Sequence, residues 1–135
     1  MWRRNGDGEI YAYLPLNDTN KAVLSQVPPK SKLNPDYGFS VGQGSFKFTP
    51  GEWSVIAQRV RLNDDGVANG EIDLWVNGTK VISACGIIIR EDPDCVVRGA
   101  HFQTFFGGES LLFSLSLSTR SITEALTHHA TRKYE

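Results

Sequence analysis

The sequence predicts an all-β fold, an antiparallel β-sandwich or jelly roll, and two observations lead to that class. Stretches that alternate between apolar and polar residues recur along the 135 residues, and Gly, Pro, Asn and Asp separate them. Helical periodicity is confined to a short stretch near the end of the chain. The length suits one domain, which can bury a core without disulfides or a metal.

The first predicted strand covers residues 9–14. Glu9, Tyr11 and Tyr13 share one face of it, and the apolar residues between them share the other. Residues 15–37 hold four prolines and little periodicity, so we expect a long loop there. Long loops in compact domains are often functional.

The rest of the chain is predicted to form short strands and one helix. The strands are expected at residues 45–48, 53–62, 71–76, 80–83, 87–89, 98–106 and 111–117. Asn77-Gly78 is a strong signal for a two-residue hairpin turn. Residues 121–124, with the sequence Ser-Ile-Thr-Glu, fit a capping box and predict a short C-terminal helix.

Charge and motifs exclude several classes of function. The 14 Lys and Arg residues nearly balance the 15 Asp and Glu residues, which argues against a nucleic-acid partner. The longest apolar run, residues 85–89, is too short to span a membrane, and no signal-peptide pattern opens the chain. Phosphate loops, nucleophile elbows and metal-ligand clusters are absent from the sequence, so we expect no cofactor and no metal.

The two cysteines, Cys85 and Cys95, are ten residues apart. They are a disulfide candidate across a hairpin-like loop, which would suit an oxidising compartment. Two independent buried thiols are an equally good interpretation.

The Tyr-x-Tyr pair is the first candidate site. Period two places Tyr11 and Tyr13 on one strand face, about 7 Å apart. A phenol can exchange a proton with a substrate when nearby cations stabilise its charged form. The alternative is a strand face covered by amphipathic aromatics, which is common in β proteins.

Two further groups are candidate substrate-binding residues. Arg59 and Arg61 share one strand face, and their forked guanidinium groups suit carboxylates, although solvated arginines on an outer sheet face would look the same. His101 and Gln103 also share a face, where the histidine could act as acid, base or hydrogen-bond partner. A structural histidine is the alternative.

Four segments, taken in order, resemble the polysaccharide lyase family 14 domain, especially its fungal members: MWRRNGDGEIYAYLP, GFSVGQGSFKFTPGEWSVIAQRVRLND, NGEIDLWVNGTKVI and RGAHFQTFFGG. The resemblance covers residues 1 to about 108. It implies a concanavalin-like jelly roll that cleaves polyuronates such as alginate or glucuronan by β-elimination. It also implies an extracellular protein that acts on an acidic polysaccharide, and we expect the protein to be a monomer.

The family site consists of a lysine, a Ser-x-Arg pair and a Tyr-x-Tyr pair around a groove. The tyrosine pair carries over onto Tyr11 and Tyr13, which the resemblance makes the catalytic residues. The Ser-x-Arg pair lies just before the Met-Trp-Arg of the family, and its lysine lies further upstream, so neither has a counterpart in this chain. Arg3 and Arg4 have a different spacing to the tyrosines and are not expected to replace them.

The departures divide the chain into a partial jelly-roll domain at residues 1–108, truncated at its N-terminus, and a divergent strand and helix at residues 109–135. Three functions stay open. The chain is a lyase domain that lacks part of its site, a non-catalytic carbohydrate-binding jelly-roll module, or a fragment with no independent function. In the second case Tyr11, Tyr13, Arg59 and His101 would hold an acidic glycan without cleaving it.

Overall fold

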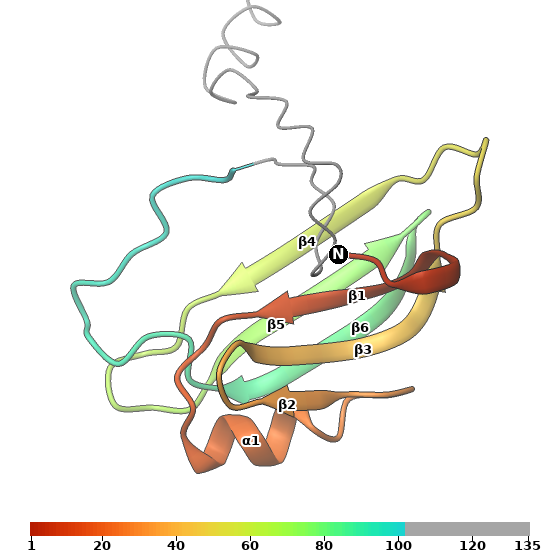
Figure 1. Cartoon of the computed structure of the whole chain (residues 1–135). Helices are drawn as coiled ribbons and strands as arrows, with labels where there is room; N and C mark the ends of the chain where they lie inside the picture. The colour runs from red at the N-terminus through yellow and green to blue at the C-terminus, as the bar shows by residue number, and fades with distance from the viewer. Residues whose placement is uncertain (102–135) are drawn as a thin grey trace, which may run out of the picture. The chain divides into compact units, whose positions relative to one another are not determined.

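The computed structural model describes residues 1–101, and Met1–Val96 form one compact unit. Within it, two three-stranded antiparallel sheets and one short α-helix confirm the predicted antiparallel β-sandwich (Figure 1). The strand and helix expected after residue 108 lie outside the described residues. In the described part of the chain, no helix is long and apolar enough to cross a membrane.

Sheet A has the strand order β1-β3-β2, formed by Asp7–Ala12, Gly38–Lys47 and Lys32–Asn34. Its register places Ala12 opposite Phe39 and Phe39 opposite Leu33, and these three apolar residues face the other sheet. The neighbouring row of paired residues, one position along each strand, consists of Tyr11, Ser40 and Lys32. Because side chains alternate along a strand, this row lies on the outer face of sheet A.

Sheet B has the strand order β4-β5-β6, formed by Ile56–Arg61, Gly70–Val76 and Thr79–Ile87. Asn77 and Gly78 join the last two strands with φ values of 49° and 82°. These left-handed conformations suit a two-residue hairpin turn, so the predicted hairpin is confirmed.

The core fills the space between the two sheets, which Figure 1 shows lying one over the other. Its buried aliphatic and aromatic side chains come from both sheets, from the helix and from the residues that follow the helix: Leu24, Val27, Phe39, Val41, Ile72, Leu74, Ile82 and Ile87. Burial of each large side chain contributes about 1.5–3 kcal/mol. The outer faces of the two sheets therefore point away from each other.

The segment 15–37 is not the long loop that its prolines predict. It contains helix α1, Asp18–Leu24, and strand β2. The Asn17 side chain caps the helix by accepting a hydrogen bond from the Asn20 backbone N–H at 2.9 Å. Because α1 has seven residues, its apolar stripe is too short to stand out as a period in the sequence.

The strand boundaries also differ from those expected. Strand β3 begins at Gly38, seven residues before the predicted start at residue 45, and bends where Gly42 and Gly44 have positive φ. Strand β6 runs on to Ile87, so the separate strand expected at 87–89 is wrong. Glycine within a strand weakens the alternating pattern on which such predictions depend.

Candidate active site

The two tyrosines lie next to each other on the outer face of sheet A. Tyr11 is in β1 and Tyr13 follows the strand end. Their ring centroids are 5.4 Å apart with the planes at 67°, an edge-to-face arrangement. Tyr13 is 78% exposed and Tyr11 is half-buried. One phenol is therefore open to solvent, while the other is partly covered by its neighbours.

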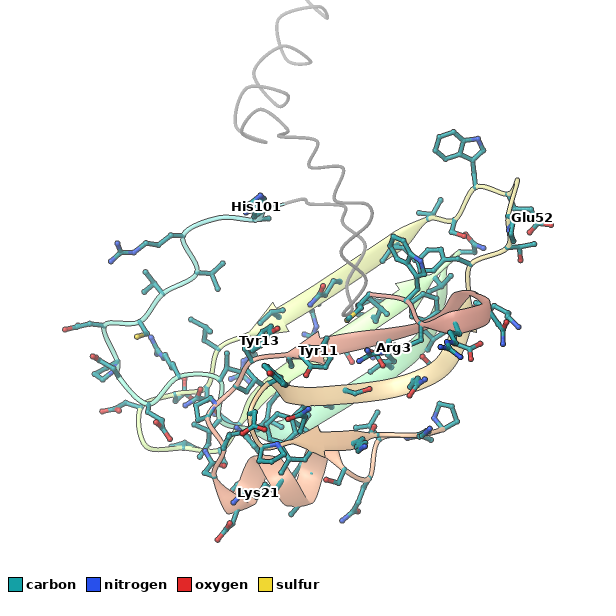
Figure 2. All side chains as sticks on the ribbon, in the orientation of Figure 1. Arg3, Tyr11, Tyr13, Lys21, Glu52 and His101 are labelled. Atoms are coloured by element: carbon teal, nitrogen blue, oxygen red, sulfur yellow. The ribbon has the colours of Figure 1, made fainter. Side chains whose placement is uncertain are left out.

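Arg3 is the cation beside this pair. Its guanidinium carbon lies 5.5 Å from the centroid of the Tyr11 ring, within the range of a cation–π contact. Figure 2 shows Arg3, Tyr11 and Tyr13 following one another along β1. The arrangement results from a reversal of the chain at Asn5 and Gly6, whose φ values are 63° and 78°.

This N-terminal reversal turns residues 1–3 back along β1. The backbone N–H of Arg3 donates to the backbone carbonyl of Asp7 at 2.7 Å. The backbone N–H of Glu9 donates to the backbone carbonyl of Met1 at 3.0 Å. Trp2 pairs with Gly8 in an antiparallel bridge. Residues 1–3 therefore lie along the edge of β1 that faces away from β3.

Glu9 holds the Arg3 side chain in place. The Glu9 side chain is 0% exposed, and its Oε1 accepts a hydrogen bond from Nε of Arg3 and forms an ion pair with Nη2, both at 2.8 Å. Its Oε2 accepts a 2.5 Å hydrogen bond from the Ser40 hydroxyl. Both carboxylate oxygens thus have partners, as a buried charge requires.

A second cation belongs to the same face. Lys32 is opposite Ser40, which is opposite Tyr11, so Lys32 lies two strands from the tyrosine, roughly 10 Å away. Its side chain is exposed, and among the described residues no carboxylate lies within ion-pair distance of it.

A pocket of about 220 Å³ opens next to Tyr11, where the free edge of β1 lies over sheet B. Its floor and walls are partly apolar and come from residues of the N-terminus and four strands: Met1, Glu9, Ile10, Tyr11, Phe46, Phe48, Ile56, Gln58 and Leu74. The site therefore combines an outer face with aromatic and cationic side chains and an open recess at its edge.

The structure places Arg59 and Arg61 on the other sheet. Both project from the outer face of β4, on the opposite side of the sandwich from the tyrosines. Arg59 pairs with Asp73 and with Glu71, and Arg61 pairs with Glu71 at 3.1 Å. Their charges are largely balanced by these carboxylates, and their role in substrate binding stays a prediction.

Asp73 is the centre of this second cluster. It accepts hydrogen bonds from the Ser83 hydroxyl and from Arg59, both at 2.7 Å, and Lys80 lies 3.2 Å away. The bond from Ser83 and the two cations lower the pKa of Asp73 to about 2, against an opposing effect of burial. The hydrogen bond to Asp73 in turn raises the pKa of Arg59.

The other candidates from the sequence are a histidine, a glutamine and two cysteines. His101 is exposed and belongs to the second compact unit, and Gln103 lies outside the described residues, so their role in substrate binding stays a prediction. Cys85 and Cys95 are exposed free thiols in this structure, and their pairing stays a prediction. Between residues 1 and 101, no group of three or more His, Cys, Asp or Glu side chains is arranged to hold a metal ion.

Arg3 and its anchor Glu9 are the residues that sequence spacing missed. Arg3 is separated from the tyrosines in the sequence, but the turn at Asn5-Gly6 reverses the chain and brings Arg3 beside them in space. Asn-Gly is the same hairpin signal that predicted the turn at Asn77-Gly78. Applied to the first ten residues, it would have predicted that Arg3 folds back onto β1.

The chain is similar to a known family of enzymes. The family described as Polysaccharide lyase 14 matches residues 1–122. Comparison with curated proteins finds no match. Among solved structures, the marine PL-14 alginate lyase from Aplysia kurodai is similar, with 31% sequence identity and a TM-score of 0.51. The similarity covers 68% of this chain and 36% of that one, so the chain matches about a third of the length of that enzyme. The chain belongs to the polysaccharide lyase 14 family.

Proposed function

We propose that this chain provides the tyrosine face of a lyase that cleaves acidic polysaccharides built from uronates, such as alginate or glucuronan. The observation that carries the proposal is the placement of Arg3 and the Tyr11–Tyr13 pair on one outer sheet face. Membership of the family and the similarity to an alginate lyase support it. Family membership also supports action outside the cell.

The proposed reaction is β-elimination. A base removes the proton at C5 of a uronate, a double bond forms between C4 and C5, and the C4–O4 bond breaks. The departing O4 takes up a proton, so the reaction needs a group that accepts one proton and a group that returns one. Tyr13 is the more exposed phenol, and we assign both transfers to its phenolic oxygen, which takes the proton from C5 and passes it to the departing O4. Tyr11 lines the face on which the sugar lies.

Negative charge grows on the uronate as the C5 proton leaves, and it requires cations or hydrogen-bond donors nearby. The register of the N-terminal residues supports a position for further donors beside the tyrosines. In the Trp2–Gly8 pairing, chain positions before Met1 would continue antiparallel to β1 and pass next to Tyr11 and then Tyr13. A Ser-x-Arg pair just upstream, as in the family, would therefore border the tyrosines and cover the pocket.

Formation of the unsaturated product tests the proposal, because its double bond absorbs ultraviolet light. The assay uses this chain and a version extended upstream with a Ser-x-Arg pair, each with alginate and with glucuronan. We expect product from the extended version, and Tyr13→Phe in it should lower turnover by about 100-fold or more. Unchanged turnover in that variant would exclude Tyr13 from proton transfer.

A second function, binding without cleavage, is favoured by one observation. Arg3 and Lys32 are exposed cations on the same face as the aromatic pair, which suits an acidic glycan whether or not a proton moves. If both versions of the protein bind polyuronate and neither forms product, the chain is a carbohydrate-binding module.

A further inference from the structure

We infer that Arg3 is the residue that binds the uronate carboxylate at the tyrosine pair, and that buried Glu9 is the positioning residue that orients it. This inference rests on the proposed function, because it concerns an acidic sugar on the same face. It adds a substrate contact from within the first ten residues of the chain.

The first step concerns the hydrogen-bond donors of Arg3. A guanidinium group carries five N–H donors in a planar fork. Glu9 Oε1 accepts a hydrogen bond from Nε and lies 2.8 Å from Nη2, and among the described residues the Arg3 side chain has no other acceptor. The side chain is 39% exposed. Its remaining donors, including both on Nη1, are therefore free to bind a second carboxylate.

The second step concerns orientation. Glu9 is fixed by burial and by the Ser40 hydrogen bond, so the edge of the guanidinium that binds Glu9 cannot turn outward. The Tyr11 ring lies 5.5 Å from the guanidinium carbon and restricts it further. A cation that is already oriented loses less conformational entropy when it binds a ligand. The forked geometry also matches a carboxylate better than an ammonium group does.

The third step concerns the reaction. The carboxylate of a uronate is bonded to C5, the carbon that loses its proton. A guanidinium that holds this carboxylate next to Tyr11 therefore brings C5 close to the phenols. It also stabilises the charge that spreads onto the carboxylate as the proton leaves.

Arg4 provides a matched control. It neighbours Arg3 in the sequence and is exposed, but its side chain has no hydrogen-bond or ion-pair partner among residues 1–101. Replacement of either arginine by glutamine changes the net charge of the protein equally. A difference between the two variants therefore reports position rather than charge.

Calorimetric titration of the chain with an alginate oligosaccharide tests the inference, with a neutral cello-oligosaccharide of equal length as the reference ligand. We expect Arg3→Gln to weaken binding of the alginate oligosaccharide about tenfold, the loss of one charge-assisted interaction. Arg4→Gln should bind as the wild type does. If Arg3→Gln does not fold, Arg3→Lys takes its place, because it keeps a positive charge opposite Glu9 but loses the fork.

Glu9→Gln tests the positioning role. It removes a negative charge, so a purely electrostatic role of Glu9 predicts tighter binding of the acidic ligand. Loss of orientation predicts weaker binding of the acidic ligand, which is the result that we expect. In the Glu9→Gln background, the affinities of the Arg3→Gln and Arg4→Gln variants should also differ less than they do in the wild type. Tighter binding by Glu9→Gln would overturn the positioning role.

The outcomes separate the inference from the proposed function. If the wild type prefers the acidic ligand and the Arg3 and Arg4 variants bind equally, the role of Arg3 is overturned while the function stands. If the wild type binds the acidic ligand no better than the neutral one, the proposed function fails and this inference fails with it.

Discussion

Glu9 shows what a single residue contributes to this site and how much of that contribution is visible in the sequence. Alternation along residues 9–13 predicts that Glu9 shares a face with Tyr11 and Tyr13. It does not predict that the carboxylate is buried. Burial depends on Ser40, 31 residues away, and on Arg3, which the N-terminal turn brings back. Contacts of this kind follow from the tertiary fold rather than from local pattern.

Asp73 makes stability depend on pH at the residue scale. Its pKa is 3.8 in an unperturbed chain and about 2 in the folded protein. Because the folded pKa is depressed, Asp73 stabilises the fold above about pH 4. That stabilisation is lost as the pH falls toward 2. We expect the free energy of unfolding of the wild type to fall across this window, measured by urea denaturation at a series of pH values.

The Asp73→Asn variant is the control for that experiment. It lacks the titrating group, so its stability deficit relative to the wild type should be greatest near neutral pH and should narrow below about pH 4. A deficit that stays constant down to pH 2 would show that Asp73 does not contribute through its charge.

At the scale of elements, the β5–β6 hairpin was predicted and the helix was not. Asn77-Gly78 fixes the β5–β6 turn by backbone conformation alone, which is a local property. Helix α1 is short and lies between prolines, and its stability comes from packing and from two asparagines. Buried Asn20 connects it to the end of β6 through hydrogen bonds with both the N–H and the carbonyl of Ile88.

The two asparagines should differ in their effect on stability. Asn17→Ala removes a helix cap at a partly exposed site and should lower the free energy of unfolding by about 1 kcal/mol. Asn20→Ala leaves the Ile88 N–H and the carbonyls of Ile88 and Pro15 without their partner. It should cost about 3 kcal/mol. Equal losses of unfolding free energy in the two variants, measured by thermal or urea unfolding, would contradict the role of Asn20 in connecting the helix to the end of β6.

At the scale of the whole unit Met1–Val96, the sandwich separates two charged faces. Strand periodicity predicted the fold class and the shared face of the tyrosines, and motif order predicted the family. Periodicity within one strand cannot say which sheet that strand joins. The alternative in which Arg59 and the tyrosines hold a glycan together could therefore not be tested from the sequence. The structure places these residues on opposite outer faces.

Chemical-shift mapping by NMR during titration with an alginate oligosaccharide tests directly which face carries the site. We expect the backbone amides around Arg3, Tyr11, Ser40 and Lys32 on the outer face of sheet A to shift as the ligand is added. The chemical shifts of the amides around Arg59 and Asp73 on sheet B should not change. Shifts confined to the sheet B face would contradict the assignment of the site to the tyrosine pair and Arg3.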